Sequence, residues 1–404
     1  MRYWVETLGC AKNQVDSEKL AGRLQAEGYE PATAPSSADL VVVNTCAFVE
    51  AARQESVDAI LELAGARRAG ARLAVTGCLA ERYGRELADA LPEVDVVAGF
   101  GQPVTLRGSS FDLLNLPRPP ATAPWAYVKV AEGCDRRCGF CAIPSFRGRQ
   151  RSRPAEAILD EIERLGVQEV VLVAQDLASY GRDLGGKALE RLVPAVAERV
   201  RRVRLLYLYP SELSDGLIDV IGRTGCPYFD LSLQHASRPH LRRMRRWGAG
   251  DRFLERIAAI RERCPDAALR SSFIVGYPGE TEEDHDQLLA FLEEAELDWA
   301  GFFPFSKEEG TLAAELPGQV PGEIVAERLA ECSEVQDPIT ARRRLSLVGT
   351  TATVLVDAPG VARSHREAPE IDGVVHVPAD LAVGGWQRVK VTSACGPDVE
   401  AEPV

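Results

Sequence analysis

The sequence contains little that would anchor it in a membrane or direct it out of the cell. No uninterrupted apolar segment approaches the roughly 20 residues that a membrane-spanning helix requires. The N-terminus lacks the basic stretch and following apolar stretch of a secretory signal. We therefore expect a cytoplasmic protein without membrane contact. In that compartment the 10 cysteines are expected to be metal ligands or free thiols rather than disulfides.

An excess of basic residues is also absent. The formal net charge of the 404 residues is −13, whereas proteins that bind nucleic acid without specificity normally carry a basic excess. Low-complexity tracts are absent as well. The length and a hydrophobic fraction of 46% suit two or three domains with well-buried cores. The composition therefore excludes an undirected nucleic-acid binder and is compatible with a positively charged protein partner.

Three cysteines lie close together in one short loop, namely Cys134, Cys138 and Cys141. A cluster of four irons takes four ligands, and no further cysteine or histidine follows before Cys226. The loop alone would leave one iron with an open position, which indicates a reactive cluster rather than a structural one. A zinc loop or three buried thiols are the alternatives. The paired C-x-x-C hooks that are typical of structural zinc are absent.

Cys10, Cys46 and Cys78 form a second set with similar local surroundings. Each ends an apolar or β-rich run and is followed by a helical pattern, the first of which Asp16 and Ser17 could cap. Three such units predict a parallel sheet with the three cysteines at its carboxyl edge, where open α/β sheets bind ligands. The set could therefore hold a second cluster, again one ligand short. Alternatively, these are small buried residues at strand ends.

The pattern along the chain predicts an α/β multidomain protein. We expect an N-terminal α/β domain over residues 1–105, a Pro-, Gly- and Ser-rich linker over 106–124, and a central domain over 125–338. Six predicted strands alternate with helical patterns in the central domain: 126–131, 169–174, 203–208, 229–233, 269–275 and 301–305. Six units are too few to close a full barrel. We expect an open partial TIM-type barrel with room for a large substrate and with Cys134 just after its first strand.

The remaining residues, 339–404, have a different pattern. Five short runs separated by Gly, Pro and Asp turns predict a small antiparallel β-barrel of the oligonucleotide-binding type: 353–356, 361–365, 374–377, 388–392 and 399–402. Such barrels often bind RNA. Residues 341–404 carry seven basic and eight acidic residues, however, and this net charge of −1 gives little support for phosphate contacts.

The Cys134–Cys141 loop resembles the radical S-adenosylmethionine signature. Together with Cys10, Cys46, Cys78 and the C-terminal module, which resembles a TRAM domain, it makes nearly the whole chain similar to the methylthiotransferase family. Further segments are similar to the branch that modifies a ribosomal protein: Thr7–Glu18, Asn44–Phe48, Gln175–Gly181, Leu233–Ser237, Arg270–Thr281 and Ala368–Gly373. Ser232 stands where this branch is expected to have proline, and the linker is short.

This resemblance implies two [4Fe–4S] clusters and S-adenosylmethionine as cofactors, and an external electron donor. Cys134, Cys138 and Cys141 would hold the cluster that binds S-adenosylmethionine and cleaves it to a deoxyadenosyl radical, and Cys10, Cys46 and Cys78 would hold the auxiliary cluster. The implied substrate is an aspartate of small-subunit ribosomal protein twelve, methylthiolated at its β-carbon. The alternatives are the branch that modifies a tRNA adenosine, a non-catalytic iron–sulfur electron carrier, and a zinc-stabilised RNA-binding module.

Other residues are ambiguous in the sequence. Gly276 and Gly279 could let the backbone approach the adenosyl group, or could form a strand-to-helix turn with Thr281 as N-cap. His235 could transfer a proton or be a hydrogen-bonded structural residue. Two groups of arginines could be solvated surface or could grip a carboxylate of the cosubstrate or substrate: Arg147, Arg149, Arg151, Arg153 and Arg242, Arg243, Arg245, Arg246. The remaining cysteines are expected to be unligated thiols: Cys226, Cys264, Cys332 and Cys395.

Overall fold

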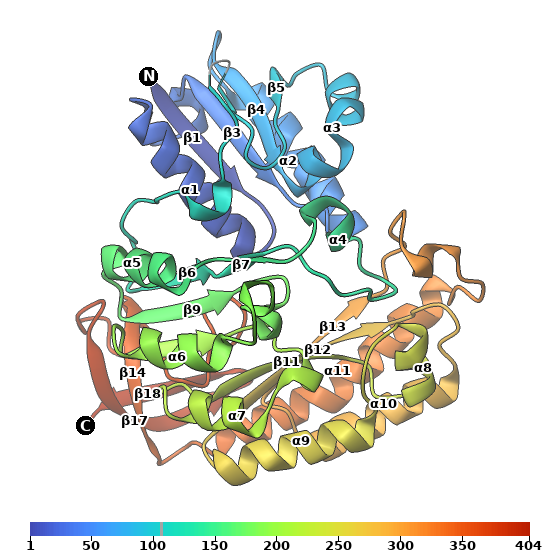
Figure 1. The fold of residues 1–404 in the computed structure, drawn as a ribbon. Coiled ribbons are helices and arrows are strands. Elements are labelled where there is room, and N and C mark those ends of the chain that lie inside the picture. Colours follow the sequence, from blue (N-terminus) through green and yellow to red (C-terminus); the bar gives the residue numbers. More distant parts are fainter. Residues whose placement is uncertain (106–107) are drawn as a thin grey trace.

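The computed structural model describes residues 1–105 and 108–404. Figure 1 shows an N-terminal α/β part, a central part beneath it, and a small C-terminal barrel beside the central part. Of the linker predicted at 106–124, residues 106 and 107 lie outside the described residues. In the described parts of the chain, no helix is both long and apolar enough to cross a membrane.

The N-terminal part is a parallel sheet of five strands in the order β2-β1-β3-β4-β5. Val41 and Val43 of the central strand face α2 and α3, while Leu40 and Val42 face α1, so that helices cover both faces. This is the parallel sheet that the repeated strand–cysteine–helix pattern predicts. Its elements are β1 (Arg2–Thr7), α1 (Ala11–Ala26), β2 (Glu30–Pro31), β3 (Leu40–Thr45), α2 (Glu50–Ala66), β4 (Arg72–Gly77), α3 (Cys78–Ala90) and β5 (Val96–Val97).

Helix α1 begins earlier than its sequence pattern predicts. Cys10 is the N-cap residue, and Asp16 and Ser17 are buried inside the helix rather than capping it. The expected cap was wrong because Asp16 has a partner in another domain, as described below.

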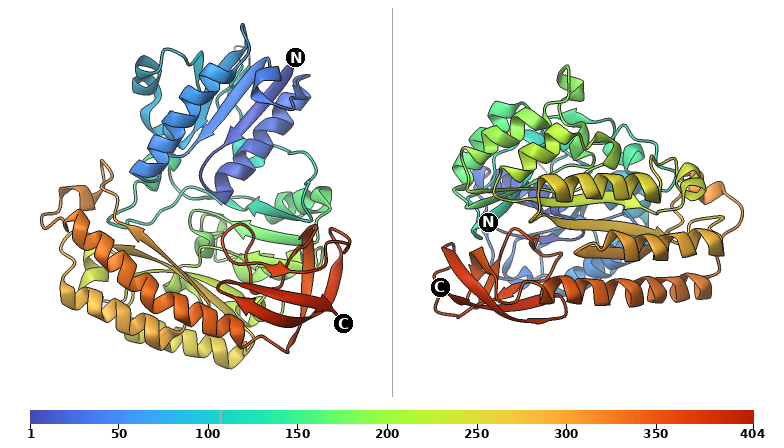
Figure 2. Two further views of the ribbon diagram at one scale, coloured as in Figure 1. Left: turned by 180° about the vertical axis from the view of Figure 1, so that it is seen from behind. Right: turned by 90° about the horizontal axis from the view of Figure 1, so that it is seen from below.

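The central part has six parallel strands in two sheets, β6-β9-β10 and β11-β12-β13, which a bridge between Leu208 and Leu231 joins into one open arc. The strands are β6 (Trp125–Lys129), β9 (Glu169–Val173), β10 (Arg202–Leu205), β11 (Tyr228–Gln234), β12 (Ala268–Val275) and β13 (Trp299–Pro304). Helices line the outer face of the arc (Figure 2) and are α5 (Ala155–Leu165), α6 (Leu189–Ala197), α7 (Asp215–Gly222), α9 (Gly250–Arg263), α10 (Glu282–Ala295) and α11 (Gly322–Leu345). The open six-unit arc is as predicted.

The concave face of the arc is not empty, although the sequence pattern suggests room there. Inward-facing side chains such as Tyr127 and Tyr228 pack against Val15 of α1 and Ala368 of the C-terminal barrel. Tyr228 also donates a hydrogen bond of 2.6 Å to Asp372, in the same segment of the barrel as Ala368. The two flanking domains therefore fill this part of the arc, and access to its interior is reduced to the carboxyl edge of the strands.

The C-terminal domain is a closed five-stranded barrel in the order β14-β15-β16-β18-β17. Its strands are β14 (Thr351–Ala358), β15 (Val361–Arg363), β16 (Val375–His376), β17 (Trp386–Cys395) and β18 (Asp398–Pro403). All neighbours are antiparallel except β16 and β18, which pair in parallel. The domain boundary predicted between residues 338 and 339 falls inside α11, because Pro338 lies within this helix without ending it.

A buried cluster of charges attaches the barrel to the central domain. Glu169 at the start of β9 is fully buried and forms ion pairs with Arg202 (3.3 Å), Arg204 (2.9 Å) and Arg363 of the barrel (3.2 Å). Burial alone would raise the pKa of Glu169, but the three arginines, led by Arg363, outweigh it and lower the pKa from 4.5 to about 2. The carboxylate is therefore charged and holds three guanidinium groups together.

We expect Glu169→Gln to destabilise the protein by roughly 3–5 kcal/mol at neutral pH, because it leaves buried arginines without their counter-charge. Since the folded-state pKa of Glu169 is lowered, its contribution is complete above the unfolded-state pKa near 4.5 and is lost as the pH falls towards 2. Chemical unfolding at several pH values tests this. The difference in the free energy of unfolding between the wild type and Glu169→Gln should shrink between pH 4.5 and pH 2. A constant difference over this range would contradict the assignment.

Candidate active site

The loop with Cys134, Cys138 and Cys141 follows β6 at the carboxyl edge of the arc, and neighbouring backbone fixes it on two sides. The amide of Cys134 donates a hydrogen bond to the carbonyl of Gly148 (3.1 Å), and the amide of Gly139 donates one to the carbonyl of Met244 (2.8 Å). Gly133 has a φ of +79°, and a Cβ there would lie 2.2 Å from the carbonyl oxygen of Arg149. Only glycine fits this turn, which sets the direction in which the loop leaves the strand.

The sulfurs of this loop are shielded and electrostatically coupled. Burial raises the pKa of Cys134 to about 11 and that of Cys141 to about 12, and each also responds to the charge of Cys138. The guanidinium of Arg246 lies 3.5 Å from the Cys138 sulfur. Without a metal, Cys134 and Cys141 are therefore thiols at neutral pH, and metal binding must release their protons.

The structure also brings Cys10, Cys46 and Cys78 together at the carboxyl edge of the N-terminal sheet. Cys10 caps α1, Cys46 follows β3, and Cys78 is the first residue of α3. A Cβ on Gly9 would lie 2.9 Å from the Cys46 sulfur, so this glycine lets the chain pass close to that cysteine. The sequence separations of thirty-six and thirty-two residues thus disappear in the fold, because parallel strands end at one edge.

The three thiols of this second set differ in their electrostatic surroundings. Burial raises the pKa of Cys46 to about 11 and also raises that of Cys78, despite Arg147 beside the latter. Burial acts in the same direction on Cys10, but Lys12, the amide of Asn13 and Arg147 outweigh it, and the pKa of Cys10 is lowered. Cys10 is therefore the most acidic thiol of this set.

The six cysteines of the two sets are free thiols, as are the other four cysteines. Each set offers three of the four ligands that a four-iron cluster takes. Among the described residues, neither set has its three sulfurs all within 4.8 Å of one another.

A single buried arginine connects the two sets. Helix α4 (Ile143–Arg147) begins two residues after Cys141 and ends at Arg147, whose guanidinium lies 3.1 Å from the Cys78 sulfur. The same guanidinium pairs with Asp16 of α1 (2.9 Å) and Glu132 (3.0 Å). The short helix α4 thus connects Cys141 of the first set to an arginine that contacts Cys78 of the second. The two sets are therefore linked through α4 and Arg147.

The structure divides the first arginine group. Arg149 and Arg151 are exposed, as expected for a solvated surface, whereas Arg147 and Arg153 are buried in ion pairs. Internal carboxylates pair with Arg147 and Arg153, so these two are not solvated surface, and a grip on a substrate carboxylate would have to compete with the internal pairs. In the second group, Arg242 and Arg245 are exposed, and Arg243 pairs with Asp284 (2.9 Å). Arg246 contacts the Cys138 sulfur and the Ser232 carbonyl, and the described ion pairs give it no carboxylate.

Gly276 and Gly279 form the strand-to-helix turn between β12 and α10. Thr281 caps α10 in a reciprocal capping box with Asp284. Cβ atoms on Gly276 and Gly279 would lie 2.4 Å from a Val325 methyl and 2.7 Å from the Arg243 guanidinium, so close packing accounts for both glycines. A contact of this turn with an adenosyl group stays a prediction.

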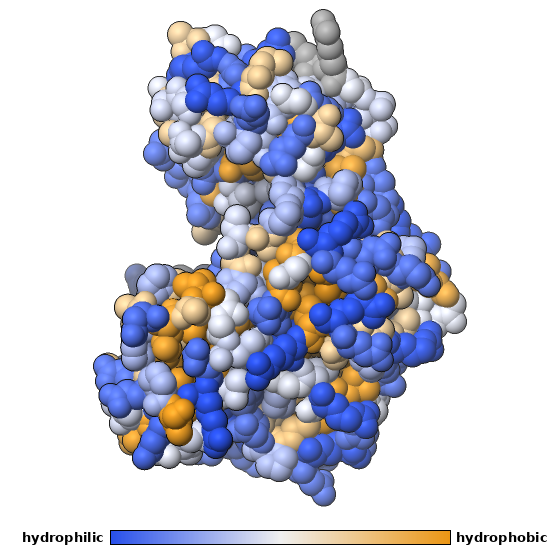
Figure 3. All heavy atoms as spheres, turned by 90° about the vertical axis from the view of Figure 1, so that its left-hand side faces the viewer, coloured by the Kyte–Doolittle hydropathy of each residue, from blue (hydrophilic) through white to orange (hydrophobic). Residues whose placement is uncertain are grey.

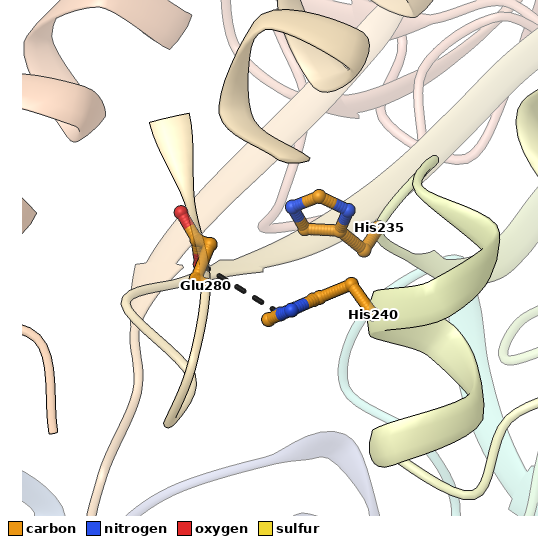
Figure 4. A group of neighbouring side chains, drawn as sticks. All are labelled: His235, His240 and Glu280. Carbon is orange, nitrogen blue, oxygen red and sulfur yellow. Dashed lines mark ion pairs between the residues drawn. The ribbon is translucent and has the colours of Figure 1, made fainter. Parts of the chain in front are cut away.

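His235 lies in a buried polar group that sequence reasoning missed. His235, His240 and Glu280 come within 4.8 Å of one another (Figure 4), and both rings are fully buried. Burial lowers the pKa of His235 and brings that of His240 to about 4, so both are neutral. The amide of Ser237 donates to Nδ1 of His235 (3.0 Å).

This hydrogen bonding argues against a metal at the group. Because Nδ1 of His235 is an acceptor, its Nε2 carries the proton and has no lone pair for an ion. Glu280 already accepts hydrogen bonds from the Gly276 amide (2.6 Å) and Arg328 (3.1 Å). The observed burial supports the structural role for His235. The other four cysteines are free, with Cys395 exposed and Cys226, Cys264 and Cys332 buried.

Two further residues at the carboxyl edge of the arc have unusual backbone conformations. Tyr207, after β10, has a φ of 66°, and Gln234, the last residue of β11, has a φ of 74°. Positive φ at bulky residues is rare and often marks functional sites. Lys12 of α1 lies with its ammonium 3.6 Å from the centre of the Tyr207 ring. No sequence pattern pointed to Tyr207 or Lys12, because their contact joins two domains.

Comparison with known proteins agrees with this architecture. The uncharacterized protein family UPF0004 matches residues 2–99, the radical SAM superfamily residues 128–292 and the TRAM domain residues 348–404. The radical S-adenosylmethionine methyltransferase TsrM from Kitasatospora setae has a similar fold, with a TM-score of 0.51, 16% identity, and coverage of 95% of this chain and 81% of TsrM. The protein is thus a radical S-adenosylmethionine enzyme, of a class that uses an iron–sulfur cluster and S-adenosylmethionine.

Curated relatives narrow this class. The protein named ribosomal protein uS12 methylthiotransferase RimO from Streptomyces coelicolor is 43% identical, with 98% of this chain and 96% of the relative aligned. The protein of the same name from Moorella thermoacetica is 44% identical, with 97% and 96% aligned. The chain belongs to the RimO family of radical S-adenosylmethionine methylthiotransferases.

Proposed function

We propose that the chain attaches a methylthio group to the β-carbon of an aspartate in ribosomal protein uS12. The observation that carries this proposal is the meeting of two cysteine sets, each one ligand short of four, at an interface bridged by α4 and Arg147. The names of the relatives from Streptomyces coelicolor and Moorella thermoacetica support the choice of substrate.

We assign a [4Fe–4S] cluster to each cysteine set: Cys134, Cys138 and Cys141 bind the first, and Cys10, Cys46 and Cys78 bind the second. When bound, the first cluster with S-adenosylmethionine supplies a radical that can remove hydrogen from an unactivated C–H bond, and the second supplies the sulfur. The chain positions these groups and keeps water away from them, since Cys46, Cys78 and Cys134 are buried.

Arg246 is suited to hold the carboxylate of S-adenosylmethionine. Its guanidinium stacks on Tyr209 at 4.0 Å and contacts the Cys138 sulfur at 3.5 Å, so it is oriented towards the first cysteine set. By contrast, Arg136, which lies in the loop between Cys134 and Cys138, forms an ion pair with Asp176 (2.6 Å). Gly276 and Gly279 lie at the same edge and are proposed to border the adenosyl group.

The remaining assignments follow from this chemistry. Cleavage of S-adenosylmethionine consumes an electron, so we propose an external electron donor. We also propose a cytoplasmic location, because ribosomes are assembled there. We propose the domain division given above, except that the barrel begins after α11 (Gly322–Leu345) rather than at residue 339. Figure 3 shows the surface hollowed where the N-terminal domain meets the rest of the molecule, with apolar side chains at the junction, and we propose that a loop of uS12 enters there.

RNA contact by the barrel has little support. Of the seven basic residues in 341–404, five are engaged in ion pairs: Arg342, Arg343, Arg344, Arg363 and Arg366. These charges attach α11 and the barrel to the rest of the chain and are not available for phosphates. This favours the ribosomal protein over tRNA as the substrate.

The test is to incubate the reduced, reconstituted enzyme with S-adenosylmethionine and either uS12 or tRNA. We expect a mass gain of one methylthio group on an aspartate of uS12 and none on tRNA. The same gain on a tRNA adenosine would overturn the proposed substrate. A non-catalytic electron carrier would consume no S-adenosylmethionine, and a zinc module would contain zinc instead of iron.

A further inference from the structure

Lys12 is a half-buried cation without a carboxylate partner among the described residues. The two fully buried lysines are both paired, Lys19 with Glu161 (3.2 Å) and Lys129 with Glu132 (2.7 Å). Among the described residues, no carboxylate lies within the 4.0 Å of an ion pair from Lys12, although the side chain is only partly exposed. Removing a charge from water is costly unless a counter-charge is found. Tyr207 and the Cys10 thiol, which is assigned to the second cluster, are the groups of the described chain that favour this charge, so a carboxylate partner would have to come from outside the chain.

The position of Lys12 in its own helix does not explain this charge. Lys12 lies in the first turn of α1, which contains no acidic residue, and a cation is unfavourable at that end of a helix. The charge acts instead on the neighbouring Cys10 thiol, whose pKa is lowered by the Lys12 ammonium and by the backbone amides of Asn13 and Lys12. The ammonium is therefore placed for something other than helix stability.

The ammonium is directed towards the central domain. It lies 3.6 Å from the centre of the Tyr207 ring, beyond the end of β10. The strained backbone of Tyr207, with φ at 66°, is held by a hydrogen bond from its amide to Asp230 (2.9 Å). The fold thus maintains a costly conformation that presents the ring beneath the ammonium, at the contact between the N-terminal and central domains.

Other cations at this interface are already occupied. Arg136 pairs with Asp176 (2.6 Å), and Arg147 pairs with Asp16 (2.9 Å). Arg246 lies on the side of the first cysteine set, 3.5 Å from Cys138. On the side of the second set, Lys12 lies two residues from Cys10 in the sequence and has no carboxylate partner among the described residues.

We propose that Lys12 binds the carboxylate of the substrate aspartate and so selects an acidic side chain. This inference rests on the proposed function. The reacting β-carbon is bonded directly to the carboxylate carbon, so an ammonium that fixes the carboxylate also fixes the β-carbon between the two cysteine sets. The Tyr207 face stabilises the ammonium while the site is empty, through a cation–π contact.

The experiment compares binding of uS12 carrying its target aspartate with binding of uS12 carrying asparagine at that position. The wild-type holoenzyme should bind the aspartate form roughly 10- to 100-fold more tightly, the range expected for a hydrogen bond to a charged group. Lys12→Met should bind both forms with equal affinity, and Lys12→Arg should retain most of the preference. Lys390→Met, which removes an exposed lysine of the barrel, is the matched control and should keep the full preference.

Three outcomes would overturn the inference. If Lys12→Met keeps the wild-type preference for aspartate, another group binds the carboxylate. If Lys12→Met instead loses about half of its iron while Lys390→Met does not, Lys12 balances the charge of the second cluster. If the wild type neither binds nor modifies either form of uS12, the proposed function itself fails. This outcome differs from failure of the inference alone, in which the wild type and Lys12→Met bind uS12 with the same preference for the aspartate form.

Discussion

Replacing Cys134, Cys138 and Cys141 together by alanine should abolish cleavage of S-adenosylmethionine and remove about half of the iron, about four of eight atoms in two cubanes. The three sulfurs share one loop and influence one another's pKa, so the loss of all three leaves no ligand for the first cluster. Iron and sulfide analysis of protein purified without oxygen, together with an assay for S-adenosylmethionine cleavage, measures both effects.

The complementary variant separates the two cysteine sets. Alanine at Cys10, Cys46 and Cys78 should also remove about half of the iron, but cleavage of S-adenosylmethionine should persist while methylthio transfer is lost. Cys395→Ala is the control, because this thiol is exposed and distant from either set in the sequence. Equal iron content in all three proteins, or zinc in place of iron, would contradict the assignment of the clusters.

Local spacing made the first cysteine set predictable from sequence, since all three residues lie in one loop. The second set was predictable for a different reason. A parallel sheet places the ends of all its strands at one edge, so Cys10, Cys46 and Cys78 meet wherever their strands pair in parallel. Neither prediction needed knowledge of contacts between domains.

Contacts between domains are what the sequence did not reveal. Asp16 has the sequence context of a helix cap, but it lies inside α1 and binds Lys129 and Arg147 of the central domain. Arg147 lies in an alternating series of arginines typical of a surface, yet it is buried. Whether a charged side chain is solvated depends on the partners that the fold brings to it, and Asp16 lies 113 residues from Lys129 and 131 residues from Arg147 in the sequence.

The filled interior of the arc has a similar origin. The strand count correctly predicted an arc that does not close, but no periodicity indicates that Ala368 and Val15 occupy its concave face. Both residues come from outside the central domain. An open arc of six strands needs such cover, since an exposed apolar face this large would otherwise be unstable in water.

Arg147→Met should destabilise the protein by roughly 3–5 kcal/mol, the cost of breaking a buried ion pair from one side. It removes the partner of Asp16 (2.9 Å) and of Glu132 (3.0 Å) at the interface of the N-terminal and central domains. Lys129 alone then faces both carboxylates. Arg147→Lys should not restore stability, because an ammonium cannot reach two carboxylates, an amide oxygen and a sulfur as a planar guanidinium does.

Arg149→Met provides a matched control two residues away. The Arg149 side chain is 93% exposed and pairs only with Asp135 at 3.4 Å, so its loss should change stability by no more than about 0.5 kcal/mol. Chemical unfolding of the two variants measures this difference. Arg147→Met should also bind less iron, because without its guanidinium the Cys78 thiol loses the charge that opposes the effect of burial on its pKa. Equal stability and iron content in Arg147→Met and Arg149→Met would mean that Arg147 does not hold the two cysteine sets in place.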